Sequence, residues 1–191
     1  VPPALLIPVH GFIQAASNGS RALFAFKSVQ WQYIKPVFLG ALIGATLMLP
    51  IIQNINWDWM QIFIGIFILY LTWGKTLKMP VRFPAPFISL GFFQGSLGML
   101  VGATGPLGSA LLLRKELSKE EIVATNAMIM LISHLLKIVL YTAIGFALFS
   151  EFQLLIWMTL ASILGSYTGT HLRLKINEAL FFRIFKVIIT L

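Results

Sequence analysis

The 191-residue sequence contains no cysteine and few charged residues, which make up only 10% of it. Without cysteine there is no disulfide framework, no thiolate metal site and no cysteine nucleophile. Globular domains carry about 25% charged residues, whereas hydrophobic residues here reach 58%, with a mean hydropathy of +0.89. These proportions exclude a disordered chain and a nucleic-acid-binding module, and they predict a membrane protein surrounded by the lipid bilayer.

Acidic residues are the scarcest charged type, with 6 Asp and Glu against 14 Lys and Arg. In a membrane protein an excess of basic residues sets topology before it indicates nucleic-acid binding. The sequence begins at Val1 without a methionine and ends at Leu191 within an apolar run. We therefore expect it to be a segment of a longer protein.

Long apolar stretches predict membrane-spanning helices, since about 20 apolar residues cross the hydrocarbon core. They cover residues 4–26, 34–52, 57–77, 86–113, 122–149, 152–172 and 177–191. The stretch at 86–113 is long and is interrupted by glycine and proline at 102–106. The predicted fold class is an all-α integral membrane protein.

The basic residues of the connectors distinguish two topologies for the interrupted stretch. If residues 86–113 cross the membrane once, the ten loop cations divide equally between the two sides, which gives no orientation. If the stretch enters, breaks and leaves by the same face, all ten lie on one side. Such an asymmetry is expected, because cytoplasmic loops hold the excess of Lys and Arg. We therefore predict a re-entrant segment, although the acidic residues at 116, 120 and 121 leave a single crossing open.

A weak internal repeat accompanies this topology. A shift of 125 residues aligns Gly40 and Gly44 with Gly165 and Gly169, and a shift of 124 aligns His10 with His134. With a re-entrant segment between them, the halves at 1–82 and 83–191 would be inverted copies. Inverted repeats that meet at broken helices are typical of transporters, so we predict an inverted-repeat helical bundle.

Polar residues form stripes on two of the predicted helices. His10, Gln14, Asn18 and Arg21 recur every three or four residues and share one face of the first helix. Asn126, His134 and Lys137 do so on the helix at 122–149. A charged group near a helix centre costs roughly 2.5–3.5 kcal/mol on insertion scales, so Lys137 should face protein or water. Hydrogen bonds between packed helices are the alternative role for the histidines, and an interfacial position is the alternative for Arg21.

Carboxylates are missing from both stripes. The six acids lie in connectors or at helix ends: Asp58, Glu116, Glu120, Glu121, Glu151 and Glu178. A metal or organic cation would call for carboxylates or a cage of oxygens, so the interior predicts a small anionic substrate and no metal. Thr104 and Gly105 at the interruption would add a hydroxyl group and the positive end of a helix.

The sequence resembles the sulfite exporter TauE/SafE family. The resemblance rests on PALLIPVHGFIQAASNGSR at 3–21, on GFFQGSLGMLVGATGP at 91–106 and on LSKEEIVATN at 117–126. It implies a carrier of sulfite or organosulfonates in the bacterial inner membrane, working as an exporter. Two departures stand out: the first glycine-rich motif of the family is missing before Val1, and Ala-Thr occupies 103–104 where glycine is common.

The expected mechanism is alternating access by rocking of one half against the other. Lys137 and Arg21 would supply charge to the anion, and His10 or His134 a proton-linked switch. Gln14, Asn18, Thr104 and Asn126 would supply hydrogen bonds. No cofactor is expected, and no enzyme motif such as His-Glu-x-x-His occurs. The alternative is a non-transporting membrane subunit packed against a partner protein, and homo-oligomerisation stays open.

Overall fold

The structure, a computed structural model, describes residues 3–56, 85–100 and 104–173, with a few isolated positions between 59 and 69. In chain order the elements are α1 (Pro3–Phe24), η1 (Phe26–Ser28), α2 (Trp31–Asn54), α4 (Pro86–Leu100), α5 (Gly105–Leu112), α6 (Lys119–Ala143), η2 (Leu148–Glu151) and α7 (Phe152–Arg173). Helices account for nearly all of these residues, and no strand occurs among them, which confirms the all-α class. Most of the helix expected at 57–77, the one expected from 177 and the boundary between the predicted halves lie outside the described residues.

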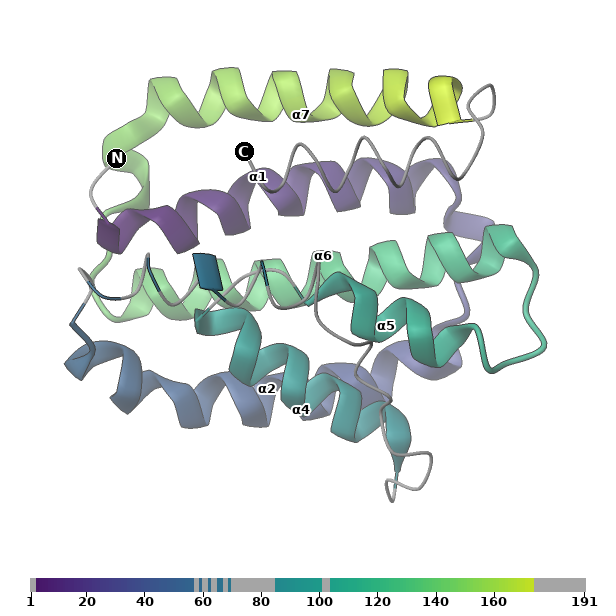
Figure 1. Ribbon diagram of the computed structural model, residues 1–191, viewed down its shortest axis with the longest axis horizontal. Coiled ribbons are helices and arrows are strands. Elements are labelled where there is room, and N and C mark those ends of the chain that lie inside the picture. The colour runs from purple at the N-terminus through teal and green to yellow at the C-terminus, as the bar shows by residue number, and fades with distance from the viewer. Residues whose placement is uncertain are drawn as a thin grey trace.

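The helices form a bundle in which α6 is central (Figure 1). Helix α1 lies between α6 and α7, while α2 and α4 pair on the opposite side of α6 and α5 packs beside α6. Helices α2 and α6 have the length and hydropathy to cross a membrane, and α4 and residues 152–168 are shorter apolar helices. The long spans and their apolar surfaces are those of an all-α membrane protein.

The interrupted stretch forms a hairpin. Helix α4 ends at Leu100 and α5 begins at Gly105, with Pro106 in its first turn, where the missing N–H is harmless. The two limbs return to the same end of the bundle, because the Lys115 ammonium lies 5.7 Å from the ring centroid of Phe87. The start of α5 lies beside the middle of α6, where a methyl group added at Gly105 would lie 3.9 Å from Met130. A segment that enters and leaves the membrane by one face, as the loop charges predict, requires a hairpin of this shape.

The end of the bundle that holds both limbs of the hairpin also gathers the described cations of the connectors, and we call it the basic end. These cations are Lys27, Lys35, Arg114, Lys115 and Lys119. The loop between α1 and α2 is fastened there to α6: the Gln30 backbone N–H donates to Thr125 Oγ1 at 3.0 Å and its side chain donates to Glu121. Ser118 and Glu121 form a capping box that starts α6.

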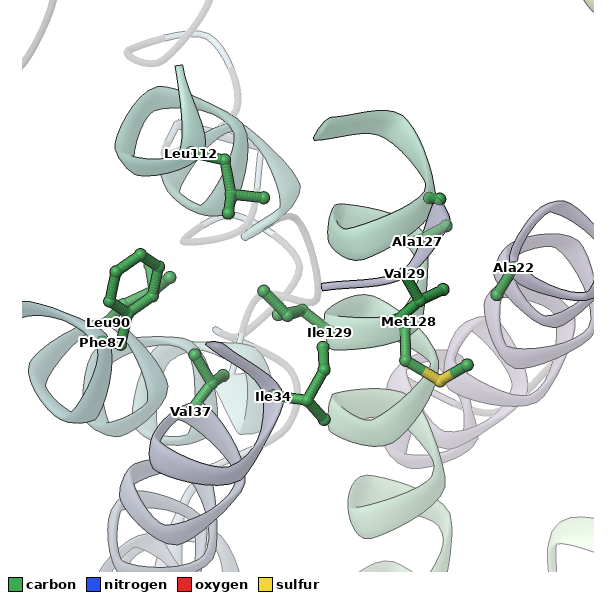
Figure 2. Close-up of a cluster of buried hydrophobic side chains, with 11 residues drawn as sticks. Ala22, Val29, Ile34, Val37, Phe87, Leu90, Leu112, Ala127, Met128 and Ile129 are labelled. Carbon is green, nitrogen blue, oxygen red and sulfur yellow. The ribbon is translucent and has the colours of Figure 1, made fainter. Parts of the chain in front are cut away.

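Apolar side chains fill the core near the basic end. Figure 2 shows Val29, Ile34 and Val37 facing Phe87 and Leu90 of α4 and Met128 and Ile129 of α6, with Leu112 of α5 and Ala22 of α1 at the margins. A second cluster joins Ile7, Ala45, Ile52, Met99 and Tyr141 toward the other end. There the Tyr141 hydroxyl donates to the Met99 carbonyl at 2.6 Å and ties the end of α4 to α6.

Four glycines bring α2 and α4 into backbone contact. A Cβ atom added at Gly40 would lie 2.0 Å from the Ile88 carbonyl oxygen, and one added at Gly91 would lie 2.0 Å from that of Val37. Gly44 and Gly95 make equivalent contacts at 2.3 Å. Because no side chain fits in this interface, glycine is required at these positions, and the two helices are held together by close packing.

We predict that Gly91→Ala lowers the stability of the protein by about 1–3 kcal/mol, because the new methyl group forces α2 and α4 apart. The measurement is the thermal unfolding midpoint of the detergent-solubilised protein. Gly165→Ala is the matched control, since no atom of the described residues lies within 4 Å of the position of its Cβ. The control should be neutral or more stable by up to about 1 kcal/mol. Equal midpoints for the two variants would contradict the close contact.

Candidate functional site

The polar stripe of α1 forms a chain of hydrogen bonds along the helix. Gln14 Nε2 donates to His10 Nε2 at 3.4 Å, and Asn18 Nδ2 donates to the Gln14 carbonyl oxygen at 2.9 Å and to its Oε1 at 3.4 Å. Asn18 is buried, and His10 and Gln14 are partly buried. The chain fixes the orientation of both amides and leaves the ring of His10 directed at α6.

His134 and Lys137 of α6 lie against this stripe, as their spacing predicts. The rings of His10 and His134 meet edge to face with centroids 6.0 Å apart. Lys137 packs its stem on Gly11, where an added Cβ would lie 3.1 Å from Lys137 Cδ. His134 is 2% exposed and Lys137 is 3% exposed. Both nitrogens of the His134 ring and the Lys137 ammonium have no hydrogen-bond partner among the described residues.

No described carboxylate lies among these groups. Glu116, Glu120 and Glu121 stand at the basic end and Glu151 in η2, while the other two acids fall outside the described residues. The described chain also holds no group of three His, Cys, Asp or Glu residues that could bind a metal ion. The site therefore offers buried donors without counter-charge, which is the electrostatic arrangement that attracts an anion.

A second polar cluster, which we call the hairpin cluster, lies at the break of the hairpin and contains Gln94, Thr104 and Asn126. Thr104 is buried next to α4, where its Oγ1 would lie 3.8 Å from a Cβ added at Gly98. Gln94 of α4 is 1% exposed and donates through Nε2 to the Thr104 carbonyl oxygen at 3.2 Å and to Met130 Sδ at 3.7 Å. Asn126 reaches this cluster from α6, because a Cβ added at Gly108 would lie 2.2 Å from its Oδ1.

Met130 links the two clusters. The side chains at 126, 130, 134, 137 and 141 of α6 recur every three or four residues, so they share one face of the helix. One end of this face meets the hairpin through Asn126 and Met130, and the middle meets α1 through His134 and Lys137. Of the residues predicted for the site, the structure thus brings His10 to His134 and Lys137, and Thr104 and Gly105 to Asn126. Gln14 and Asn18 are joined to His10 by hydrogen bonds along α1.

Arg21 lies apart from both clusters. Its side chain is exposed, and its guanidinium donates to Ser17 Oγ at 3.1 Å. It lines a mainly apolar cavity of about 340 Å³ between α1 and α7, together with Phe24, Leu164 and Tyr167. This placement matches the alternative role given to Arg21 at the edge of the membrane, rather than contact with Lys137.

Sequence reasoning missed two residues of the hairpin cluster. Gln94 was grouped with the glycine motif, yet an amide in an otherwise apolar helix is a signal of its own, since a buried polar group must find a partner. Gly108 could not be singled out, because its role depends on the close approach of Asn126 from another helix.

A broken-helix hairpin packed against a polar helix interface, with no carboxylate among the described residues there, is an arrangement that membrane transport proteins use. A model of the sulfite exporter TauE/SafE family matches residues 1–191, and the chain belongs to this family. Its members are membrane transporters rather than enzymes. The comparisons with curated proteins and with solved structures return no match.

We predict that Gly108→Ala disturbs the hairpin cluster, because the added methyl group would overlap Asn126 Oδ1. Overpacking of this kind costs about 1–3 kcal/mol, to be measured as a fall in the unfolding midpoint. Gly105→Ala in the same helix is the matched control, since its nearest neighbour would be Met130 at an ordinary 3.9 Å. A midpoint in Gly108→Ala as high as that of the control would show that Asn126 does not approach α5.

Proposed function

We propose that the protein carries small sulfur oxyanions, such as sulfite or organosulfonates, out of the cell across the bacterial inner membrane. The observation that carries this proposal is the buried Lys137 ammonium, which has no partner in the described residues and no described carboxylate beside it. Family membership supplies the sulfur-anion chemistry. In this orientation the basic end faces the cytoplasm, in keeping with the excess of cations there.

The anion would bind between α1 and α6. A buried charge without a partner costs several kcal/mol, so the Lys137 ammonium needs an anion or water beside it. His134 offers up to two ring N–H donors, and His10 and Gln14 lie on the facing helix. Three or four donors around one position suit a compact oxyanion, since each of its oxygens accepts several hydrogen bonds. A site of this kind binds the anion through charge and hydrogen bonds together.

The directions of the helices support the inverted-repeat proposal. Helix α1 runs toward the basic end and α6 runs away from it, so these proposed counterparts are antiparallel (Figure 1). The same holds for α2, which runs away from that end, and α7, which runs toward it. Under this proposal, His134 occupies the position in the second half that His10 holds in the first.

The packing favours moving units other than the two sequence halves. Helix α1 of the first half packs chiefly on α6 and α7, while α2 of the first half is held against α4 by the four glycines. Close-packed helices move as one body. We therefore propose that α2 and α4 move together relative to α1, α6 and α7. The anion site between α1 and α6 stays within the second body, and the movement of α2 and α4 along α6 covers or uncovers it.

Removal of the ammonium tests the site. Lys137→Met should reduce flux of labelled sulfite into vesicles that hold the purified protein by more than about tenfold, because loss of a charged hydrogen-bond donor costs about 1.5–3 kcal/mol of anion binding. The control is Lys27→Met, which removes an exposed cation of η1. Both variants should remain folded, as measured by their unfolding midpoints. Unchanged flux in a folded Lys137→Met protein would remove this residue from the site.

The same assay separates the remaining alternatives. A carrier moves sulfite unaided, whereas a non-transporting subunit shows no flux above empty vesicles. Arg21→Met should retain flux within about twofold, because Arg21 faces the cavity beside α7 and not the Lys137 cluster. A loss in Arg21→Met as large as that in Lys137→Met would move the anion path to the interface of α1 and α7.

A further inference from the structure

The hairpin cluster differs in polarity from the proposed anion site. Its unpartnered groups are oxygens: Gln94 Oε1 and Asn126 Oδ1 are both buried and have no hydrogen-bond partner in the described residues. Buried amide oxygens are normally paired, and an unpaired one indicates a missing donor or cation. An anion cannot satisfy them, since it also carries only acceptors. The cluster therefore favours an occupant that donates hydrogen bonds or carries positive charge.

The orientation of Gln94 is fixed by its neighbours. Its Nε2 donates to the Thr104 carbonyl oxygen and to Met130 Sδ, so the amide cannot turn over without setting two oxygens against each other. Its Oε1 is consequently directed away from that carbonyl. Gly108 keeps the amides of Gln94 and Asn126 close together, because an added Cβ there would lie 3.3 Å from Gln94 Nε2 and 2.2 Å from Asn126 Oδ1.

The backbone at the break adds negative potential. Helix α4 ends at Leu100, and the last carbonyl groups of a helix have no intrahelical partner and form the negative end of its dipole. Thr104 contributes a buried hydroxyl that faces α4. Broken membrane helices use such carbonyl ends and side-chain oxygens to coordinate small monovalent cations. Mg²⁺ and Ca²⁺ are poor candidates, because their sites depend on carboxylates that this cluster lacks.

The two basic side chains on the same face of α6 stand far enough away to permit this occupant. His134 and Lys137 follow Asn126 by 8 and 11 residues on α6, which corresponds to about 12 and 17 Å along the helix axis. We infer that the oxygens of Gln94, Asn126 and Thr104 at the break of the hairpin form a binding site for Na⁺. The site is distinct from the anion site and shares with it one face of α6.

Thermal unfolding tests the inference on the full-length chain in detergent, with NaCl, KCl or choline chloride at the same concentration. NaCl should raise the unfolding midpoint above that in choline chloride, and KCl should raise it less, because its larger ion is poorly matched to few ligands. Gln94→Leu should weaken the apparent Na⁺ affinity at least tenfold. Lys137→Met should keep the response, since Lys137 is not a ligand.

If Gln94→Leu does not fold, Asn126→Asp tests the same site with a second variant. Replacing the amide oxygen by a carboxylate should strengthen Na⁺ binding by tenfold or more, which a folding defect cannot produce. A wild-type midpoint equal in NaCl and choline chloride, a response to KCl as large as to NaCl, or an affinity unchanged in Asn126→Asp would overturn the inference. Sulfite flux is a separate readout: its absence together with an intact Na⁺ response would contradict the proposed transport alone.

Discussion

One electrostatic constraint governs the proposed site: cationic and hydrogen-bond-donating groups are buried in a helix bundle whose described interior contains no carboxylate. Lys137 and His134 are nearly inaccessible and have no partner in the part of the chain that the structure describes. Such groups are costly to bury, and the structure holds them on rigid helices, with the Lys137 stem packed on Gly11. Under the proposed function, an anion that enters the site recovers part of this free energy.

The packing of the helices makes this arrangement durable. Glycines at the interface of α2 and α4 allow backbone contact, which turns these two helices into one unit. Hydrogen bonds of Tyr141 to α4 and of Gln30 to Thr125 hold the two ends of α6 against its neighbours. Helix α6 therefore presents a continuous polar face to α1 on one side and to the hairpin on the other. Binding at either part of that face acts on the same helix, which offers a physical route for coupling between them.

Much of this could be predicted from the sequence, because hydropathy, helical periodicity and loop charge are local properties. The spacing of His134 and Lys137 placed them on one face, and the loop cations predicted the hairpin that Lys115 and Phe87 now outline. Contacts between segments that are distant in the sequence could not be predicted in this way. Arg21 shares the helical stripe of His10, yet its long side chain turns toward α7. Gln94 and Gly108 have their roles only because α4, α5 and α6 pack together, and the periodicity of a single helix does not predict this packing.

Anomalous diffraction from crystals soaked in selenite tests the central claim most directly, because selenite resembles sulfite in shape and charge and selenium can be located without ambiguity. We expect an anomalous peak between α1 and α6, within about 4 Å of the Lys137 ammonium, which is the distance of a close ion pair. A selenium peak confined to the cavity beside Arg21, or crystals soaked in saturating selenite that show no peak near Lys137, would contradict the proposed anion site.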